Sequence, residues 1–182
     1  MSSFNYKQAR KRMLKQFILV GALCITPFGV KAVDCPEFSQ GQVAVLKKAH
    51  AYGSHNMGGN WGVVLAAISY QESSAGDKVV NHKGSYGVFQ NKLTTVTNRT
   101  GERPAVAKKK LIRSFDYSAE QAKNELDYWN ERYYLKTGQP NNLTRVLASY
   151  NAGYNVSAGK GYAKQVKQKM KIVEHCIINK EG

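Results

Sequence analysis

Apolar residues recur at helical spacing along most of this chain, and this pattern limits its fold more than any other feature. Residues three and four apart share one face of a helix, so each apolar stripe can be buried against another. Strand-like alternation is scarce, with one candidate at 87–96. The sequence therefore predicts a mainly α fold of packed helices in one domain. The stripes run through Val43–Ala49, Trp61–Ile68, Ala122–Tyr133, Leu143–Tyr150 and Tyr162–Val173.

Turn and capping residues indicate where these helices begin and end. We expect the first helix to end near Tyr52-Gly53, because glycine favours a helix terminus. Ser118, with Gln121 three residues later, predicts a capping box at the start of the third stripe. Gly138 and Pro140 predict the end of that helix, and residues 151–153 end the next one.

The first 32 residues differ in composition from the rest. They hold six Lys and Arg residues and no acid, and 17–30 is an uncharged run of 14 residues before Val30-Lys31-Ala32. A basic segment, a short apolar run and a small-residue site are typical of a secretory signal peptide, whereas a membrane span takes about 20 residues. We therefore expect a cleaved leader at 1–32 and a periplasmic domain at 33–182. A retained N-terminal anchor is the alternative.

The remaining charge is still basic. The whole chain carries a net charge of +15, and residues 33–182 hold 21 basic and 12 acidic residues. Such a charge can attract anionic wall polymers without a binding code, so we expect no specific nucleic-acid site. We interpret the run at 108–110 as a solvated face. The same interpretation applies to the acidic residues Asp116, Glu120, Glu125, Asp127 and Glu131.

Two cysteines, Cys35 and Cys176, lie outside the leader. In an oxidising compartment an even pair is expected to be bridged, which predicts a disulfide between the two ends of the domain. The alternative is two unrelated buried thiols. The histidines and cysteines lack the spacing of metal ligands, so no metal site is expected.

A carboxylate closes the second apolar stripe. From Trp61 through Ile68 to Glu72, stripe residues stand at offsets 0, 3, 4, 7 and 11, which places them on one arc of a helix. Partial burial disfavours a charged carboxylate and raises its pKa, as a general acid requires near neutral pH. The alternative is a solvated glutamate at a frayed helix end.

Four short motifs follow one another in order. Glu72-Ser73 comes first, followed by Gly87-Val88-Phe89-Gln90, then by Ala148-Ser149-Tyr150-Asn151-Ala152-Gly153, and last by Tyr162 four residues before Val166. In this order and spacing the chain resembles the soluble lytic transglycosylases, relatives of goose-type lysozyme that cleave the glycan strands of peptidoglycan. The resemblance covers about residues 53–170. It implies a lysozyme-like domain with a substrate groove, acting as a monomer on peptidoglycan strands.

The resemblance assigns a role to each matching residue. Glu72 corresponds to the single catalytic acid/base, and Ser73 to the residue that orients it or caps the helix. The family often has serine nine residues beyond the glutamate, where it helps to hold the N-acetyl group of the substrate. Here that residue is Asn81, whose amide can still donate a hydrogen bond.

The later motifs correspond to the substrate groove. Gln90 matches the groove residue of the second motif, with Phe89 in place of the usual methionine. Tyr150 and Asn151 match the pair that supports the catalytic carboxyl and lines the sugar site, and Tyr162 extends that wall.

The implied reaction is substrate-assisted and needs no cofactor. Glu72 protonates the oxygen that links N-acetylmuramic acid to N-acetylglucosamine, and then accepts the proton of the muramic acid C6 hydroxyl as a 1,6-anhydro ring closes. This differs from the two-carboxylate scheme of most glycosidases.

Two alternatives stay open at this point. One is a goose-type lysozyme-like hydrolase, in which Asp77 positions a water molecule. The other is a non-catalytic cationic protein that binds glycan or nucleic acid. General wall turnover, wall opening for a secretion or conjugation apparatus, and a phage role all fit the sequence.

We predict that the mature protein begins at Val33 and lies outside the inner membrane. Mass spectrometry of the N-terminal peptide from the expressed protein measures the cleavage site directly. An intact leader on protein that only detergent extracts would contradict this prediction and favour the anchor.

Overall fold

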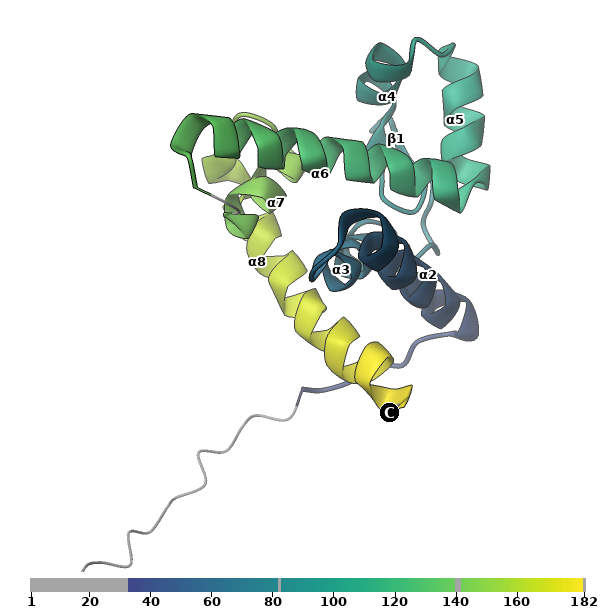
Figure 1. The fold of residues 1–182 in the computed structure, drawn as a ribbon. Helices are drawn as coiled ribbons and strands as arrows, with labels where there is room; N and C mark the ends of the chain where they lie inside the picture. Colours follow the sequence, from purple (N-terminus) through teal and green to yellow (C-terminus); the bar gives the residue numbers. More distant parts are fainter. Residues whose placement is uncertain (1–32, 82, 140–141, 182) are drawn as a thin grey trace, which may run out of the picture. The chain divides into compact units, whose positions relative to one another are not determined.

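The computed structural model describes residues 33–81, 83–139 and 142–181, so the expected signal peptide lies outside the described residues. Within this part the protein is mainly α, as the apolar stripes predict. No helix in the described segments is both long enough and apolar enough to cross a bilayer. Figure 1 shows the helices α2 (Gln40–Met57), α3 (Trp61–Ser73), α4 (Leu93–Thr100), α5 (Pro104–Arg113), α6 (Phe115–Thr137), α7 (Leu143–Ala152) and α8 (Val156–Val173).

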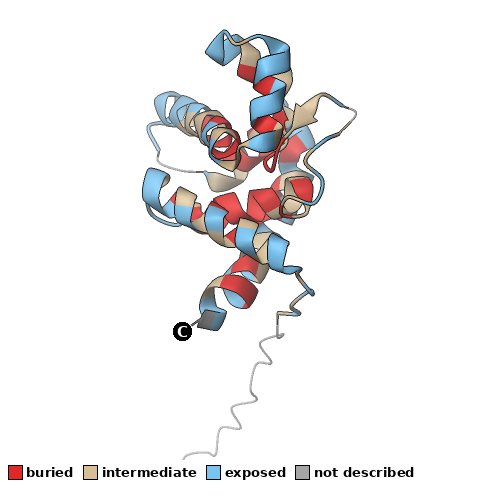
Figure 2. Cartoon of the chain, turned by 90° about the vertical axis from the view of Figure 1, so that its right-hand side faces the viewer, coloured by how far each residue is buried: buried red, intermediate tan, exposed pale blue. Residues whose placement is uncertain are grey.

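The core is built around α3. Every residue from Gly62 to Ser69 is buried, so this stretch of the helix is enclosed on all sides, as expected where a helix is apolar all round. It packs against α2 and α8, and α8 also packs against α7. In Figure 2 the buried residues gather along these inner helices, while the outward faces are exposed.

Helix α2 ends later than the sequence predicts. It starts with a capping box, in which Ser39 and Gln42 each bond the other's backbone N–H. It then continues past Gly53 to Met57, so the expected end at 52–53 is wrong. A Cβ at Gly53 would lie 2.6 Å from the carbonyl oxygen of Trp61. The glycine therefore serves the close contact with α3 and does not end the helix.

Helix α6 also starts earlier than predicted. Its N-cap is Ser114, whose side chain accepts a hydrogen bond from the Tyr117 N–H, so the capping box expected at Ser118 is wrong. Ser118 is buried inside the helix, where Asn91 Nδ2 donates to its carbonyl oxygen and lies 3.0 Å from its hydroxyl. The predicted C-terminal end is confirmed, because Gly138 caps the helix at φ 62°.

Little of the expected extended segment at 87–96 is strand. Strand β1 (Ser85–Tyr86) pairs antiparallel with β2 (Asn91–Lys92), and residues 87–90 form the turn between them. Residues from Leu93 onward are helical in α4. Helices α4 and α5 then bury a small separate cluster of Val96, Ala107 and Leu111.

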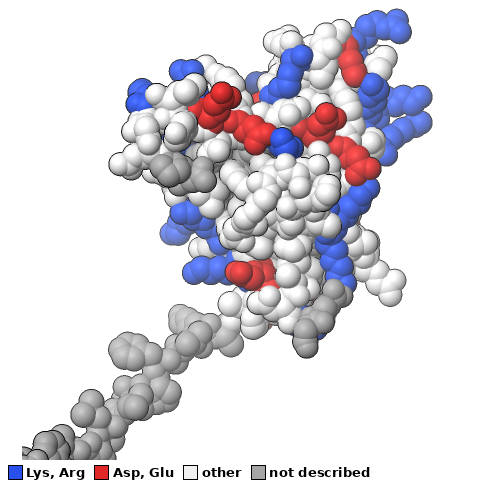
Figure 3. Space-filling view, in the orientation of Figure 1, with Lys and Arg blue, Asp and Glu red and all other residues white. Residues whose placement is uncertain are grey.

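Charged side chains are unevenly distributed over the surface. In Figure 3 the acidic side chains follow α6, whereas lysines and arginines gather over α5. Lys108 and Lys109 are exposed, as expected of a solvated face, and Lys110 pairs with Glu102 at 2.7 Å. Surface pairs of this kind add little to stability.

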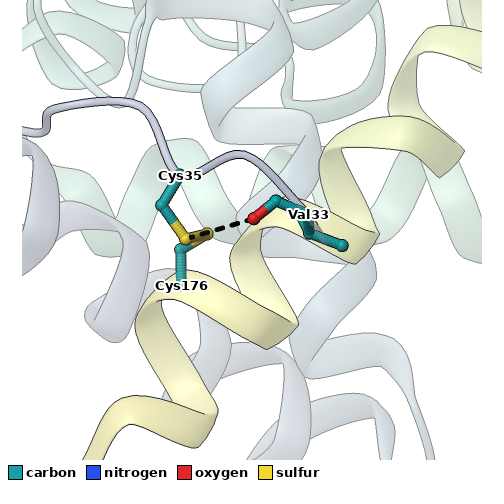
Figure 4. Close-up of a disulfide and its surroundings, with 3 residues drawn as sticks. All are labelled: Val33, Cys35 and Cys176. Atoms are coloured by element: carbon teal, nitrogen blue, oxygen red, sulfur yellow. Dashed lines mark hydrogen bonds between the residues drawn. A yellow bond between two sulfur atoms is a disulfide. The ribbon is translucent and has the colours of Figure 1, made fainter. Parts of the chain in front are cut away.

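The two ends of the domain are joined by the Cys35–Cys176 disulfide, with a Cα–Cα distance of 5.7 Å (Figure 4). Beyond α8 the chain continues as a π-helical turn, Glu174–Ile178, in which Cys176 is buried. The sulfur of Cys35 also lies 3.9 Å from the carbonyl oxygen of Val33. A disulfide sulfur has no proton to donate, so this is a packing contact.

We predict that replacing Cys35 and Cys176 together with alanine lowers the free energy of unfolding by about 4–5 kcal/mol. The bridge closes a loop spanning 141 residues, and the value follows from the entropy that this loop removes from the unfolded chain. Chemical denaturation of the oxidised protein measures the loss. Each single variant should lose about as much as the double variant, because each breaks the same bond. A free-thiol titration that finds two thiols in the unfolded, unreduced mature protein would contradict the bridge.

Candidate active site

One cavity brings together residues from four helices and the small hairpin. Its volume is about 510 Å³, and Glu72 lies in its wall at the last turn of α3. Of the residues assigned by resemblance, Gln90, Tyr150 and Asn151 line the same cavity. We call this cavity the Glu72 groove. Its other lining residues are Ser85, Asn91, Lys92, Thr95, Val96, Arg99, Gln121, Glu125, Trp129, Ser149, Ala152, Gly153 and Tyr154.

The Glu72 carboxyl is partly buried between the core and the groove. Burial raises the pKa of Glu72 from 4.5 to about 7, while the neighbouring Tyr162 hydroxyl opposes the shift. The position at the C-terminal end of α3 further disfavours negative charge. Glu72 can therefore hold its proton near neutral pH, as the apolar stripe predicts, and it is not a solvated glutamate at a frayed end.

Two tyrosines stand beside this carboxyl. The rings of Tyr150 and Tyr162 stack with centroids 6.4 Å apart, and the Tyr150 hydroxyl donates to the carbonyl oxygen of Phe89 at 2.9 Å. Burial, followed by the charge of Glu72, raises the pKa of both hydroxyls well above the usual value. The Tyr162 hydroxyl is buried and has no regular hydrogen bond among the described residues, yet it is close enough to Glu72 to act on the pKa of the carboxyl. Both tyrosine hydroxyls therefore keep their protons and can donate hydrogen bonds.

Ser73 holds the backbone next to Glu72. Its side chain is buried, donates to the carbonyl oxygen of Val88 at 2.7 Å and accepts from the Gly76 N–H at 2.8 Å. The following residues Ser74 and Ala75 have φ values of 52° and 56°, which are costly for residues with a side chain. Ser73 thus links the end of α3 to the second motif and fixes the direction of Glu72.

Gln90 is held by an internal network. Its φ is 47°, and its Nε2 donates to the carbonyl oxygens of Lys78 and Gly87. Asn81 Nδ2 donates to Gln90 Oε1 at 2.6 Å, while Asn81 Oδ1 accepts from two backbone N–H groups. Asn81 is not among the residues that line the groove, so here it positions Gln90.

Phe89 does not contact the groove with its side chain, contrary to its assignment as a groove residue. The ring is fully buried in the core and packs edge-on against Phe115, with centroids 5.6 Å apart. Its contribution to the site is the backbone carbonyl that accepts the bond from Tyr150. Tyr162 likewise acts from behind the groove wall, through Glu72 and Tyr150.

A second carboxylate lines the groove, and it is not Asp77. Asp77 is exposed and lies outside the groove lining, whereas Glu125 of α6 lies within it. Arg99 pairs with Glu125 Oε2 at 2.5 Å, and the Trp129 indole N–H donates to Glu125 Oε1 at 2.7 Å. The interpretation of Glu125 as part of a solvated face is therefore wrong.

The sequence held one signal for this pair. Glu125 precedes Trp129 by four residues, so the two share a helix face. Trp129 belongs to the buried stripe of α6, which places Glu125 at its border. The sequence gives no such signal for Arg99, because this residue is 26 positions from Glu125 and only the tertiary structure brings α4 next to it. Across the described residues, no three of the His, Cys, Asp and Glu side chains come together as metal ligands would.

Comparisons with known proteins agree with this geometry. The model of the transglycosylase SLT domain family matches residues 53–173, which include all four motifs and Glu72. An uncharacterized 20.7 kDa protein of Enterobacteria phage T4 is 34% identical over 116 residues, which cover 59% of this chain and 60% of the phage protein. No solved structure matches. The chain belongs to the transglycosylase SLT domain family.

Proposed function

We propose that this protein is a peptidoglycan lytic transglycosylase that cleaves the β-1,4 bond between N-acetylmuramic acid and N-acetylglucosamine and leaves 1,6-anhydro ends. The observation that carries the proposal is a single carboxyl, Glu72, whose pKa is raised to about 7 by burial at the wall of a groove. A general acid is most effective when its pKa lies near the working pH. Membership of the family supports the same substrate class.

The reaction uses Glu72 twice. In the first step the neutral carboxyl donates its proton to the glycosidic oxygen as the C1–oxygen bond breaks, and the N-acetyl carbonyl oxygen of the muramic acid stabilises C1. In the second step the Glu72 carboxylate accepts the proton of the C6 hydroxyl, whose oxygen bonds to C1. The glutamate is protonated again, and no water is consumed.

Tyr162 supports the intermediate stage. Its neutral hydroxyl lies beside Glu72 and favours the charged form of that carboxyl. It can therefore stabilise the carboxylate that exists between the two proton transfers. Tyr150 holds the Phe89 carbonyl and stacks on Tyr162, so it keeps this hydroxyl in place.

Glu125 favours a second candidate, a lysozyme-like hydrolase, because hydrolysis can use another carboxylate to position water. Both oxygens of Glu125 already accept hydrogen bonds, one from Arg99 and one from Trp129. These two donors already engage both carboxylate oxygens, so Glu125 is poorly placed to orient a water molecule. The transglycosylase reaction, which needs no second carboxylate, is therefore our first proposal.

We also propose that the protein is exported and works locally in the wall, at a secretion or conjugation assembly. The Cys35–Cys176 disulfide supports an oxidising compartment. Outside the family match, the described residues add most of α2 and the Cys35–Cys176 disulfide. In this proposal a partner in the assembly places the enzyme in the wall.

We predict that Glu72→Gln keeps the fold and glycan binding but lowers the rate by the upper end of 10²–10⁴, or more. The amide retains size and hydrogen bonding but has no proton to transfer, and this one group serves both steps. Chromatography and mass spectrometry of muropeptides released from purified sacculi measure the rate and identify anhydro ends.

Matched variants separate the two candidate reactions. Asp77→Asn should keep near wild-type activity, because Asp77 lies outside the groove lining. Glu125→Gln should reduce the rate far less than Glu72→Gln and leave anhydro products. Anhydro release by folded Glu72→Gln near the wild-type rate would refute the role of Glu72, and reducing ends from the wild type would establish a hydrolase.

We predict that Glu72→Gln is more stable than the wild type at pH 8, by up to about 3 kcal/mol, and similar at pH 4. The pKa of Glu72 is about 7 in the folded protein and 4.5 as the reference value for the unfolded chain. The stabilising effect of the bound proton is full below pH 4.5 and is lost as the pH rises through 7. Denaturation at several pH values measures the difference. If the two proteins differ in stability by the same amount at pH 4 and pH 8, the carboxyl is not held neutral. The wild-type rate should also fall as the pH rises through 7.

A further inference from the structure

An exposed tyrosine stands at the edge of the Glu72 groove. Tyr154 lies just after α7, four residues beyond Tyr150, and its ring contributes to the groove lining. The Tyr154 side chain is 71% exposed. Neither the four motifs nor the reaction proposed above uses this residue.

Three neighbours fix the Tyr154 ring in position. The hydroxyls of Tyr154 and Tyr128 lie 2.9 Å apart in a hydrogen bond. The Trp129 ring stands at 80° to the Tyr154 ring with centroids 5.2 Å apart, and the Arg132 guanidinium lies 4.8 Å from the ring centre on one face. Such contacts remove the entropy cost that a mobile side chain would incur on binding. The Tyr154 ring is therefore held in one position, and its exposed surface is available to a ligand.

We propose that Tyr154 forms a sugar-stacking subsite of the Glu72 groove, which binds a pyranose ring of the glycan strand away from the bond that is cleaved. This inference rests on the function proposed above and adds a residue that determines how the strand is held. Tyr128 and Arg132 of α6 hold the Tyr154 ring from outside the groove lining.

The chemistry of the subsite fits a sugar better than an apolar partner. A pyranose ring has an apolar face of C–H groups and an edge of hydroxyls. The open part of the Tyr154 ring offers an apolar surface, and the two tyrosine hydroxyls and the Arg132 guanidinium offer hydrogen bonds beside it. The subsite is also continuous with the groove that contains Glu72, so a strand bound at one can reach the other.

The contacts of Tyr154 point to binding and not to proton transfer. Among the described residues, its ring and hydroxyl contact Tyr128, Trp129 and Arg132, and not Glu72. Removing the ring should therefore raise the substrate concentration needed for half-maximal rate more than it lowers the maximal rate.

The test uses the full chain and soluble glycan strands without stem peptides. Tyr154→Ala should raise KM about tenfold, equivalent to about 1.4 kcal/mol, and change kcat by no more than about twofold. Tyr154→Trp, which keeps an aromatic face, should stay near the wild type. Tyr134→Ala is the matched control, because Tyr134 is an exposed tyrosine of the same helix as Tyr128 and lies outside the groove lining.

A binding measurement separates this inference from the proposed function. In the Glu72→Gln background, which does not turn over, Tyr154→Ala should lower retention on purified sacculi, and Tyr134→Ala should not. If Tyr154→Ala leaves KM unchanged in the active enzyme and retention unchanged in the Glu72→Gln background, the subsite is wrong and the proposed reaction stands. A wild type that releases no anhydro ends, yet binds strands through Tyr154, would overturn the reaction alone.

Discussion

The burial of α3 on every side is the constraint on which the site depends. Packing of residues 62–69 against α2 and α8 sets the position of α3, and with it the position of the residue at its last turn. That residue is Glu72, where the apolar core gives way to a polar groove. The same packing removes water from one side of the carboxyl, which raises its pKa, and leaves the other side open to substrate. The contacts that bury α3 in the core thus also raise the pKa of Glu72.

The sequence predicts those features that depend on local order along the chain. Helix periodicity gave the mainly α class and placed Glu72 at the end of an apolar stripe, because both follow from the angle between neighbouring residues. Helix ends were less predictable. Gly53 is a residue type that often ends a helix, but here it allows the close contact with Trp61. Ser118 is a residue type that often caps a helix, but here it lies inside α6 and accepts a hydrogen bond from Asn91. In both cases a tertiary contact overrides the local preference.

The groove itself was only partly predictable. Gln90, Tyr150 and Asn151 belong to motifs, whereas Arg99, Glu125 and Tyr154 come together only because α4, α6 and the end of α7 meet in space. No spacing in the sequence relates Arg99 to Glu125. Phe89 shows the opposite case, since a residue within a motif serves through its backbone carbonyl while its side chain fills the core. A motif therefore identifies a neighbourhood, and the fold decides which atoms face the substrate.

The disulfide has a mechanical consequence for the whole domain. Cys35 and Cys176 lie at opposite ends of the domain sequence, yet their Cα atoms are 5.7 Å apart. Tension applied between the two ends of the chain would pass through this covalent bond and bypass the helices in between. Traction on either terminus, from a tether or from a strained polymer network, would move the domain as a whole. The Glu72 groove would keep its shape, and Glu72 its position, while the chain is under tension.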